Sequence, residues 1–156
     1  MLEACRARSS TLATAESCTG GLVAARLTSV PGSSDVFLGA VVAYADAVKA
    51  AELGVPEAAL ERHGAVSAEV AAAMAAGARE RLQADVAVSV TGVAGPGGGT
   101  EEKPVGLVYL HAEGAYGSLA RELNLPGERE AIRQRATVAA LHLVRTLLAR
   151  SRHEDA

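Results

Sequence analysis

One short stretch of this sequence combines a hydroxyl side chain with a turn that exposes backbone amides. It reads Ala-Glu-Ser-Cys-Thr-Gly-Gly at 15–21, after the β-prone run Thr11–Thr14 and before the apolar-periodic run Leu22–Leu27. This order predicts a strand, a tight turn and a helix, with Ser17 at a helix N-terminus where backbone N–H groups are free. A hydroxyl there suits a nucleophile whose oxyanion meets those amides. The alternative is that Ser17 or Thr19 simply caps the helix.

A long glycine-rich loop is the second signal. The segment 91–106, Thr-Gly-Val-Ala-Gly-Pro-Gly-Gly-Gly-Thr-Glu-Glu-Lys-Pro-Val-Gly, holds six glycines. They let the backbone approach a ligand closely and turn its amides toward an anion. The loop is not a P-loop, since no Gly-Lys-Ser/Thr follows, and not a dinucleotide fingerprint, since the glycine spacing differs. Loops of this length are commonly functional, so we favour ligand binding over a plain flexible loop.

Lysine is rare in this chain and therefore informative. Of the 15 basic residues only Lys49 and Lys103 are lysines, so each is a candidate for an amine that must lose its proton. Lys49 lies on a predicted helix that follows a strand, from which it can face Ser17 as a general base. The alternative is a solvated surface lysine. Lys103 stands three residues after Thr100, but Pro104 disfavours the helix that such a dyad requires, so Lys103 is better interpreted as a cation for a phosphate or carboxylate.

Other reactive side chains give weaker signals. Cys18 is intrinsically a stronger nucleophile than Ser17, but we expect its side chain to point away from that of Ser17 and interpret it as a small buried residue. Arg129 and Arg133 are four residues apart on one helix face, a spacing that suits a phosphate clamp but that more commonly marks solvated charge. The four histidines have no metal-ligand spacing, and we predict no metal site.

Composition limits the class of protein. The chain has 156 residues, of which 49% are hydrophobic and only 3% aromatic, which predicts one domain with a core of small side chains. Its net charge of −3 argues against nucleic-acid binding as the main role. It holds no apolar run of about 18 residues and no signal-peptide core, so we expect a cytoplasmic protein without membrane segments. Two cysteines, Cys5 and Cys18, are too few for a disulfide framework.

Periodicity and helix breakers predict the elements that hold these residues. Strands are expected at Thr11–Ala15, Phe37–Tyr44, Val86–Thr91, Val105–Ala112 and Ser118–Leu123. Helices are expected at 2–9, Gly20–Ser29, Asp46–Leu53, Pro56–Arg62, Ser67–Leu82 and from Pro126 to about Ser151, before a polar tail that frays. Asp46 and Ser67 are the expected caps of their helices, and the nearly all-apolar second strand is expected to be buried. Helices between strands indicate one three-layer α/β/α domain, and the terminal hairpin makes its sheet of about five strands mixed.

Taken together, these motifs resemble one family. The segment 15–21, Pro-Gly-Ser-Ser at 31–34, the run Tyr44 to Lys49, His-Gly-Ala-Val-Ser at 63–67 and the loop at 91–106 are similar to the CinA C-terminal domain family. Its stand-alone members are PncC-type nicotinamide-nucleotide amidases. The resemblance covers nearly the whole chain, and its first and last motifs are highly specific. Between Tyr44 and Lys49 the sequence departs from the family pattern Tyr-Ser-Asn-Glu-Ala-Lys, but it keeps both end residues.

The resemblance implies hydrolysis of the carboxamide of nicotinamide mononucleotide to nicotinate mononucleotide and ammonia, without a cofactor, in pyridine nucleotide recycling. It assigns Ser17 as the nucleophile of an acyl-enzyme mechanism and Lys49 as its general base, with Tyr44 nearby. The turn and the glycine-rich loop would supply oxyanion amides and hold the ribose phosphate. Substrate contacts are thereby assigned to Cys18, Thr19, Gly20 and Gly21 in the turn, to Thr91, Gly92, Gly95, Gly97, Gly98 and Thr100 in the loop, and to Lys103, Arg129 and Arg133.

Two alternatives stay open at this point. One is a non-catalytic nucleotide-binding or competence-related regulatory module, and the other is an amidase that acts on a different amide. The expected partner is a small-molecule substrate rather than a nucleic acid or a membrane, and the Ala-rich helix at 67–82 offers a surface for a homo-oligomer. Larger family members carry an N-terminal domain, whereas here we expect the single domain 1–156.

Overall fold

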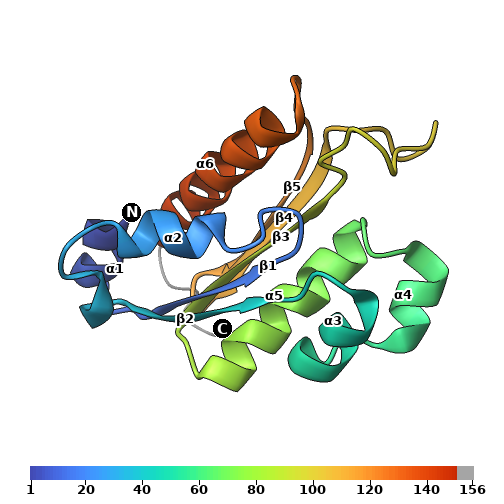
Figure 1. Ribbon diagram of the computed structural model, residues 1–156. Helices are drawn as coiled ribbons and strands as arrows, with labels where there is room; N and C mark the ends of the chain where they lie inside the picture. Colours follow the sequence, from blue (N-terminus) through green and yellow to red (C-terminus); the bar gives the residue numbers. More distant parts are fainter. Residues whose placement is uncertain (151–156) are drawn as a thin grey trace.

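A computed structural model describes residues 1–150 (Figure 1). Its helices are α1 (Leu2–Ala7), α2 (Leu22–Thr28), α3 (Asp46–Leu53), α4 (Glu57–His63), α5 (Ala68–Leu82) and α6 (Arg129–Leu148), with a short 3-10 turn at Ser33–Asp35. Its strands are β1 (Leu12–Glu16), β2 (Phe37–Val42), β3 (Val86–Gly92), β4 (Leu107–Gly114) and β5 (Gly117–Asn124). The predicted succession of elements is confirmed, while the tail predicted to fray lies outside the described residues.

The five strands form one mixed sheet in the order β2-β1-β3-β4-β5. β1 is parallel to β2 and to β3, whereas β4 and β5 are each antiparallel to the strand before them. After β1 the chain therefore forms β2 at one edge of the sheet, and it then crosses to β3 on the other side of β1. The strand order reverses between β1 and β3, and in open α/β sheets ligands bind at this point, outside the carboxyl ends of the strands.

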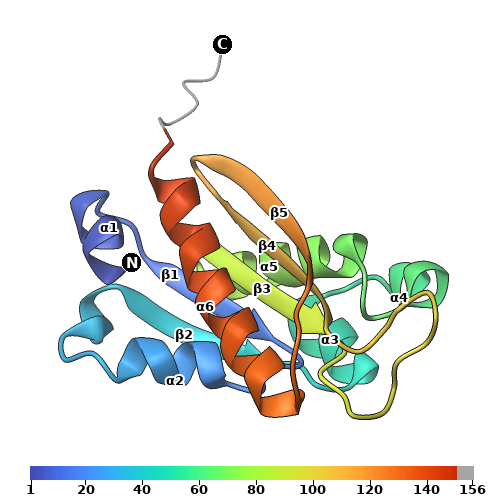
Figure 2. The same ribbon diagram turned by 90° about the horizontal axis from the view of Figure 1, so that it is seen from above.

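Helices cover both faces of the sheet, as the three-layer prediction requires (Figures 1 and 2). α1, α2 and α6 lie on one face, and α3, α4 and α5 lie on the other. The buried residues of α6 recur mostly every three or four positions and include Ile132, Ala136, Ala140, Leu143 and Leu147. The Ala-rich helix α5 likewise buries one face inside the chain, through residues that include Val70, Ala71, Met74, Ala75 and Ala78.

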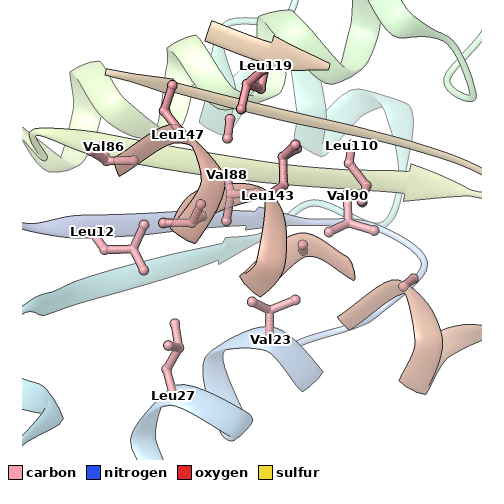
Figure 3. Close-up of a cluster of buried hydrophobic side chains, with 14 of the residues drawn as sticks. Leu12, Val23, Leu27, Val86, Val88, Val90, Leu110, Leu119, Leu143 and Leu147 are labelled. Carbon is pink, nitrogen blue, oxygen red and sulfur yellow. The ribbon is translucent and has the colours of Figure 1, made fainter. Parts of the chain in front are cut away.

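The larger of two hydrophobic clusters fills the space between the sheet and the α2–α6 layer (Figure 3). The strands contribute Leu12, Val86, Val88, Val90 and Leu110, and the helices contribute Val23, Leu27, Leu143 and Leu147. Most of these side chains are aliphatic and of moderate size, which matches the low aromatic content of the chain. Tyr116 is the one aromatic ring among the buried residues of this cluster, so close packing of helix and strand rests mainly on aliphatic side chains.

The prediction that the second strand is fully buried was wrong. β2 is an edge strand whose residues alternate between partly buried and exposed, with Leu38 47% and Val42 45% exposed. Its apolar composition suggested a central strand, but position in the sheet depends on long-range pairing that the strand's own residues do not encode. Side chains at alternate positions therefore point to the α2 side of the edge, where α2 covers them only in part.

Two local predictions can be compared directly with the structure. Ser67 caps α5, because its Oγ accepts a hydrogen bond from the Val70 amide at 3.3 Å. The hairpin is tighter than predicted, since Gly114 pairs with Gly117 and leaves a two-residue turn. Tyr116 in that turn is only 1% exposed, and its hydroxyl lies 3.3 Å from Ser10 Oγ, which ties the hairpin end to the chain before β1.

Candidate functional site

The carboxyl ends of the three parallel strands meet at one edge of the sheet and surround a cavity of about 300 Å³. Its lining residues are Ser17, Cys18, Tyr44, Asp46, Lys49, Ala65, Val66, Thr91, Gly92, Val93, Ala94, Gly95, Gly97, Gly98 and Arg129. They come from the turn after β1, the segment from the end of β2 into α3, the α4–α5 connection, and the loop after β3. The cavity thus lies where the strand order reverses, which is the expected position for a ligand site in this type of sheet.

Ser17 begins the turn between β1 and α2. Its amide donates to the Val90 carbonyl at 2.9 Å, and its own carbonyl accepts from the Gly20 amide at 3.0 Å, so the backbone is held at both ends. The side chain is 8% exposed and lines the cavity. Within residues 1–150 no protein group hydrogen-bonds to Ser17 Oγ, so the hydroxyl is available to a ligand in the cavity.

The helix that follows the turn is capped in a way that the sequence did not suggest. Its N-cap residue is Gly21, which has no side chain, so neither Ser17 nor Thr19 is the cap that we considered as an alternative. The buried Glu16 carboxylate instead accepts from the amides of Gly21, Val23 and Ala24 at 2.8–3.0 Å. The expectation that free helix amides point past the hydroxyl was therefore wrong for these three groups.

The Thr19 amide in the turn has no protein acceptor in the described part of the chain, whereas the Cys18 amide interacts with the thiol of its own residue. The carbonyls of the same two residues accept from Arg133, at 3.2 Å from Nε and 3.1 Å from Nη2. In a trans peptide the carbonyl and the N–H point in opposite directions. Arg133 therefore orients the two peptide units that carry the Thr19 and Gly20 amides, and it is not among the residues that line the cavity.

Lys49 is a buried lysine, not a solvated one. It is 1% exposed, and its Nζ donates to the Tyr44 carbonyl at 3.1 Å and lies 3.5 Å from Asp46 Oδ1. The alternative of a solvated surface lysine is therefore wrong, because α3 packs against α5 and encloses this side chain. Asp46 does not cap α3, whose N-cap is Ala45; it lies in the first turn and pairs with Lys49 instead.

Arg129 joins the glycine-rich loop to the segment after β2. Its Nη1 donates to the Gly95 carbonyl at 2.7 Å and its Nη2 to the Tyr44 hydroxyl at 3.0 Å. On the opposite wall, Thr91 Oγ1 donates to the Ala65 carbonyl at 2.8 Å. These contacts connect segments that are far apart in the sequence: Arg129 of α6 joins the glycine-rich loop to Tyr44, and Thr91 of β3 joins the α4–α5 connection.

The structure gathers some of the predicted site residues and separates others. The cavity brings together Ser17, Cys18, Tyr44, Lys49, Thr91, Gly92, Gly95, Gly97, Gly98 and Arg129. It does not include Thr19, Gly20, Gly21, Thr100, Lys103 or Arg133. The Lys103 ammonium donates to the His63 carbonyl, and its amide donates to Thr100 Oγ1 at 2.9 Å. Both residues therefore belong to the outer part of the loop, where a turn replaces the helix that Pro104 excludes.

The Cys18 thiol belongs to the core rather than to the reactive side of the turn. Cys18 is 5% exposed and packs in the hydrophobic cluster under α2 and α6. Burial raises the pKa of this thiol from its ordinary value of 9.0 to about 11. Because the thiolate is the nucleophilic form, burial disfavours Cys18 as a nucleophile at neutral pH and agrees with its interpretation as a small buried residue.

Sequence reasoning missed two acidic residues at the site, Glu16 and Asp46. Glu16 is adjacent to the serine in the motif, but its role depends on the direction in which α2 leaves the turn. Asp46 had a local signal, its i,i+3 spacing to Lys49, that capping obscured. Among residues 1–150 no group of three histidine, cysteine or acidic residues is arranged to hold a metal ion. In the same part of the chain, no helix has both the length and the apolar character needed to cross a bilayer.

The fold and the site together define a class: three-layer α/β domains that hold a serine and a buried lysine where the strand order reverses. Within this class, the chain belongs to the CinA family, since the model of the CinA C-terminal domain matches residues 1–148. A CinA-like protein of Mycolicibacterium paratuberculosis is 59% identical over 142 residues, which are 88% of this chain and 33% of that protein. One of Desulfotalea psychrophila is 52% identical over 141 residues, with 90% and 34% covered. The chain thus spans about a third of these relatives.

Solved structures agree with the family assignment. The competence/damage inducible protein CihA of Agrobacterium tumefaciens has a TM-score of 0.91 at 42% identity, covering 94% of this chain and 90% of that chain. A CinA superfamily protein of Escherichia coli has a TM-score of 0.87 at 34% identity, covering 94% and 84%. The three-layer fold with a five-stranded mixed sheet is therefore shared with experimentally determined members of the family.

Proposed function

We propose that this chain is a nicotinamide-nucleotide amidase, which hydrolyses the carboxamide of nicotinamide mononucleotide to nicotinate mononucleotide and ammonia. The observation that carries the proposal is the pairing of two groups in one cavity: Ser17, whose hydroxyl is free of protein partners, and Lys49, an amine 1% exposed. A nucleophile needs a base within reach, and no histidine lines this cavity in the described chain. The specific motif resemblance to PncC-type amidases supplies the substrate class.

In the proposed mechanism Lys49 acts as a neutral amine and takes the proton from Ser17 Oγ. The Oγ attacks the carboxamide carbon, and the C–N bond of the tetrahedral intermediate then breaks as Lys49 returns a proton to the leaving nitrogen, which departs as ammonia. Water, deprotonated by Lys49, attacks the resulting acyl ester. The C–Oγ bond breaks, Ser17 regains its proton, and nicotinate mononucleotide leaves.

Backbone amides are the proposed oxyanion donors. Those of Cys18 and Thr19 follow Ser17 directly, and that of Thr19 has no protein acceptor among residues 1–150, so this turn is suited to the charge that develops on the substrate oxygen. Gly97 and Gly98 line the cavity and allow close approach of the loop to the ribose phosphate. Arg129 also lines the cavity, and we assign it to the phosphate, with Tyr44 positioned by their shared hydrogen bond.

Ammonia release from nicotinamide mononucleotide by the wild type, Ser17→Ala and Lys49→Met tests the proposal. Methionine keeps much of the length of Lys49 without its charge, so the buried site stays filled. We expect a loss of at least about 10³-fold in kcat for each variant, in line with removal of a nucleophile or its base, while both variants keep the circular dichroism spectrum of the wild type. Release that survives Ser17→Ala would overturn the nucleophile assignment. Tight nucleotide binding without turnover by the wild type would favour the non-catalytic module instead.

A further inference from the structure

Glu16 is the most unusual side chain near the candidate site that the proposed mechanism does not use. It is the last residue of β1, it is fully buried at 0% exposure, and it directly precedes Ser17. No ion pair joins it to a lysine or arginine within residues 1–150. Burying a charged group without a cation raises the free energy of the folded state. A glutamate at this position, beside the proposed nucleophile, therefore calls for a function that a smaller polar residue cannot perform.

Five donors satisfy the Glu16 carboxyl group completely. Its Oε2 accepts from Thr19 Oγ1 at 2.7 Å and from the Gly21 and Val23 amides at 3.0 Å each. Its Oε1 accepts from the Ala24 amide at 2.8 Å and from Thr14 Oγ1 at 3.3 Å. Both oxygens act as acceptors, which is the pattern of a carboxylate, and the N-terminus of α2 supplies three of the donors.

The position of this cap along the chain distinguishes it from an ordinary one. An N-cap side chain comes from the residue just before the helix and restrains little of the chain that precedes it. Glu16 reaches forward from the strand, so its hydrogen bonds close a ring around residues 17–20. The segment that carries Ser17 is thereby fixed to β1 at one end and to α2 at the other, while the Thr19 amide within it has no protein acceptor among residues 1–150.

We propose that Glu16 is a positioning residue that holds Ser17 in its reactive orientation. The proposal rests on the proposed function only in taking Ser17 as the nucleophile. In Glu16→Gln one acceptor oxygen becomes an NH₂ donor that must face the backbone N–H groups of α2. The ring around 17–20 then opens on one side, and Ser17 loses its fixed geometry. Because misplacement of a reacting group by about 1 Å can cost on the order of 10²-fold in rate, the effect falls on the chemical step.

The test uses two readouts on the full chain, with wild type, Glu16→Gln and Leu147→Ala. The first is the rate of covalent labelling of Ser17 by a fluorophosphonate, located by peptide mass spectrometry, and the second is kcat and KM for ammonia release from nicotinamide mononucleotide. Leu147 is a fully buried residue near the far end of α6, so its variant controls for lost stability. We expect Glu16→Gln to lower the labelling rate and kcat by about 10- to 100-fold with KM within about threefold, while Leu147→Ala keeps both rates within about twofold well below its Tm.

Thr19→Val keeps the proposal testable if Glu16→Gln fails to fold. It removes the 2.7 Å donor to Oε2 with little change in side-chain shape, and Thr19→Ser, which keeps the donor, is its matched control. We expect Thr19→Val alone to lower the labelling rate. Labelling at the wild-type rate in folded Glu16→Gln or in Thr19→Val would overturn the positioning role. If the reagent labels Ser17 of the wild type but the wild-type protein releases no ammonia, the proposed function fails, and the labelling rates still decide the role of Glu16. If the reagent does not label Ser17 of the wild type, both proposals fail.

Discussion

Ser17 and Cys18 are neighbours in the chain whose surroundings are opposite. The serine hydroxyl lines the cavity without a protein partner, whereas the cysteine packs in the core under α2 and α6. Intrinsic nucleophilicity favours the thiol, but burial raises its pKa to about 11 and so withholds the reactive thiolate. At this scale the environment, not the chemistry of the free side chain, favours Ser17 as the proposed nucleophile.

The first prediction follows from this contrast. We expect Cys18→Ala to retain ammonia release within about fivefold of the wild type, because a buried thiol with a raised pKa contributes packing rather than chemistry. We also expect iodoacetamide at pH 7.5 to leave the activity of the native protein unchanged, since burial raises the pKa of Cys5 to about 11 as well. Both are measured with the ammonia assay. Inactivation by iodoacetamide with alkylation mapped to Cys18 would contradict the assignment of Ser17.

Residue types and spacing predicted part of this site. The motif at 15–21 and the glycine-rich loop identified Ser17 and six other lining residues because both segments follow strands directly. The burial of Lys49 could not be derived in this way, since it depends on how α3 packs against α5. The ring closed by Glu16 was missed for the same reason: its acceptors and donors are brought together only by the direction of α2.

At the level of elements, the approach of α5 to α3 shows how small residues set the packing distance. Gly77 lies in the middle of α5 where the end of α3 crosses it, and a Cβ built there would stand 1.8 Å from the Leu53 carbonyl oxygen. The neighbouring Ala76 is exposed and has no such constraint. This contact holds α3 in place, and α3 carries Lys49, so a residue without a side chain at position 77 contributes to the geometry of the site.

The second prediction sets two effects of opposite sign against each other at this contact. Replacing a helical glycine by alanine stabilises a helix by about 1 kcal/mol, whereas overpacking costs about 1–3 kcal/mol and more when a backbone must move. The obstacle here is backbone, so we expect Gly77→Ala to lower the free energy of unfolding by about 2 kcal/mol or more. Urea unfolding measures it. Ala76→Gly, which reports helix propensity alone, is expected to cost about 1 kcal/mol, and a stabilised Gly77→Ala would contradict the contact.

On the scale of the whole molecule, the two edges of the sheet differ. β5 carries Arg121 and Glu122, charges that protect an edge from pairing with other strands, whereas β2 has no charged residue between Phe37 and Val42. The sequence predicted the strands but not which of them would be edges, because strand order is fixed by the crossovers. The apolar β2 was for that reason misinterpreted as central, while the sheet type and the layers were predicted correctly.

Stability of the whole domain at acidic pH supplies the last prediction. Burial lowers the pKa of His111 below its ordinary value of 6.5, and Glu113, whose Oε2 lies 3.8 Å from His111 Nε2, opposes this shift only in part. The unfolded chain therefore binds a proton at this position at a higher pH than the folded chain. Stability that is present above pH 6.5 is lost as the pH falls through that value toward the folded pKa, by less than about 1.4 kcal/mol per pH unit.

His111→Gln isolates this contribution, because glutamine fills a similar space and takes up no proton. We expect the Tm of the wild type to fall more steeply between pH 7 and pH 5 than that of the variant, as measured by differential scanning calorimetry in buffers of equal ionic strength. His142→Gln, a substitution at an exposed position on α6, is the matched control and should keep the wild-type slope. Equal slopes for wild type and His111→Gln would show that the His111 imidazole does not limit the stability of the domain between pH 7 and pH 5.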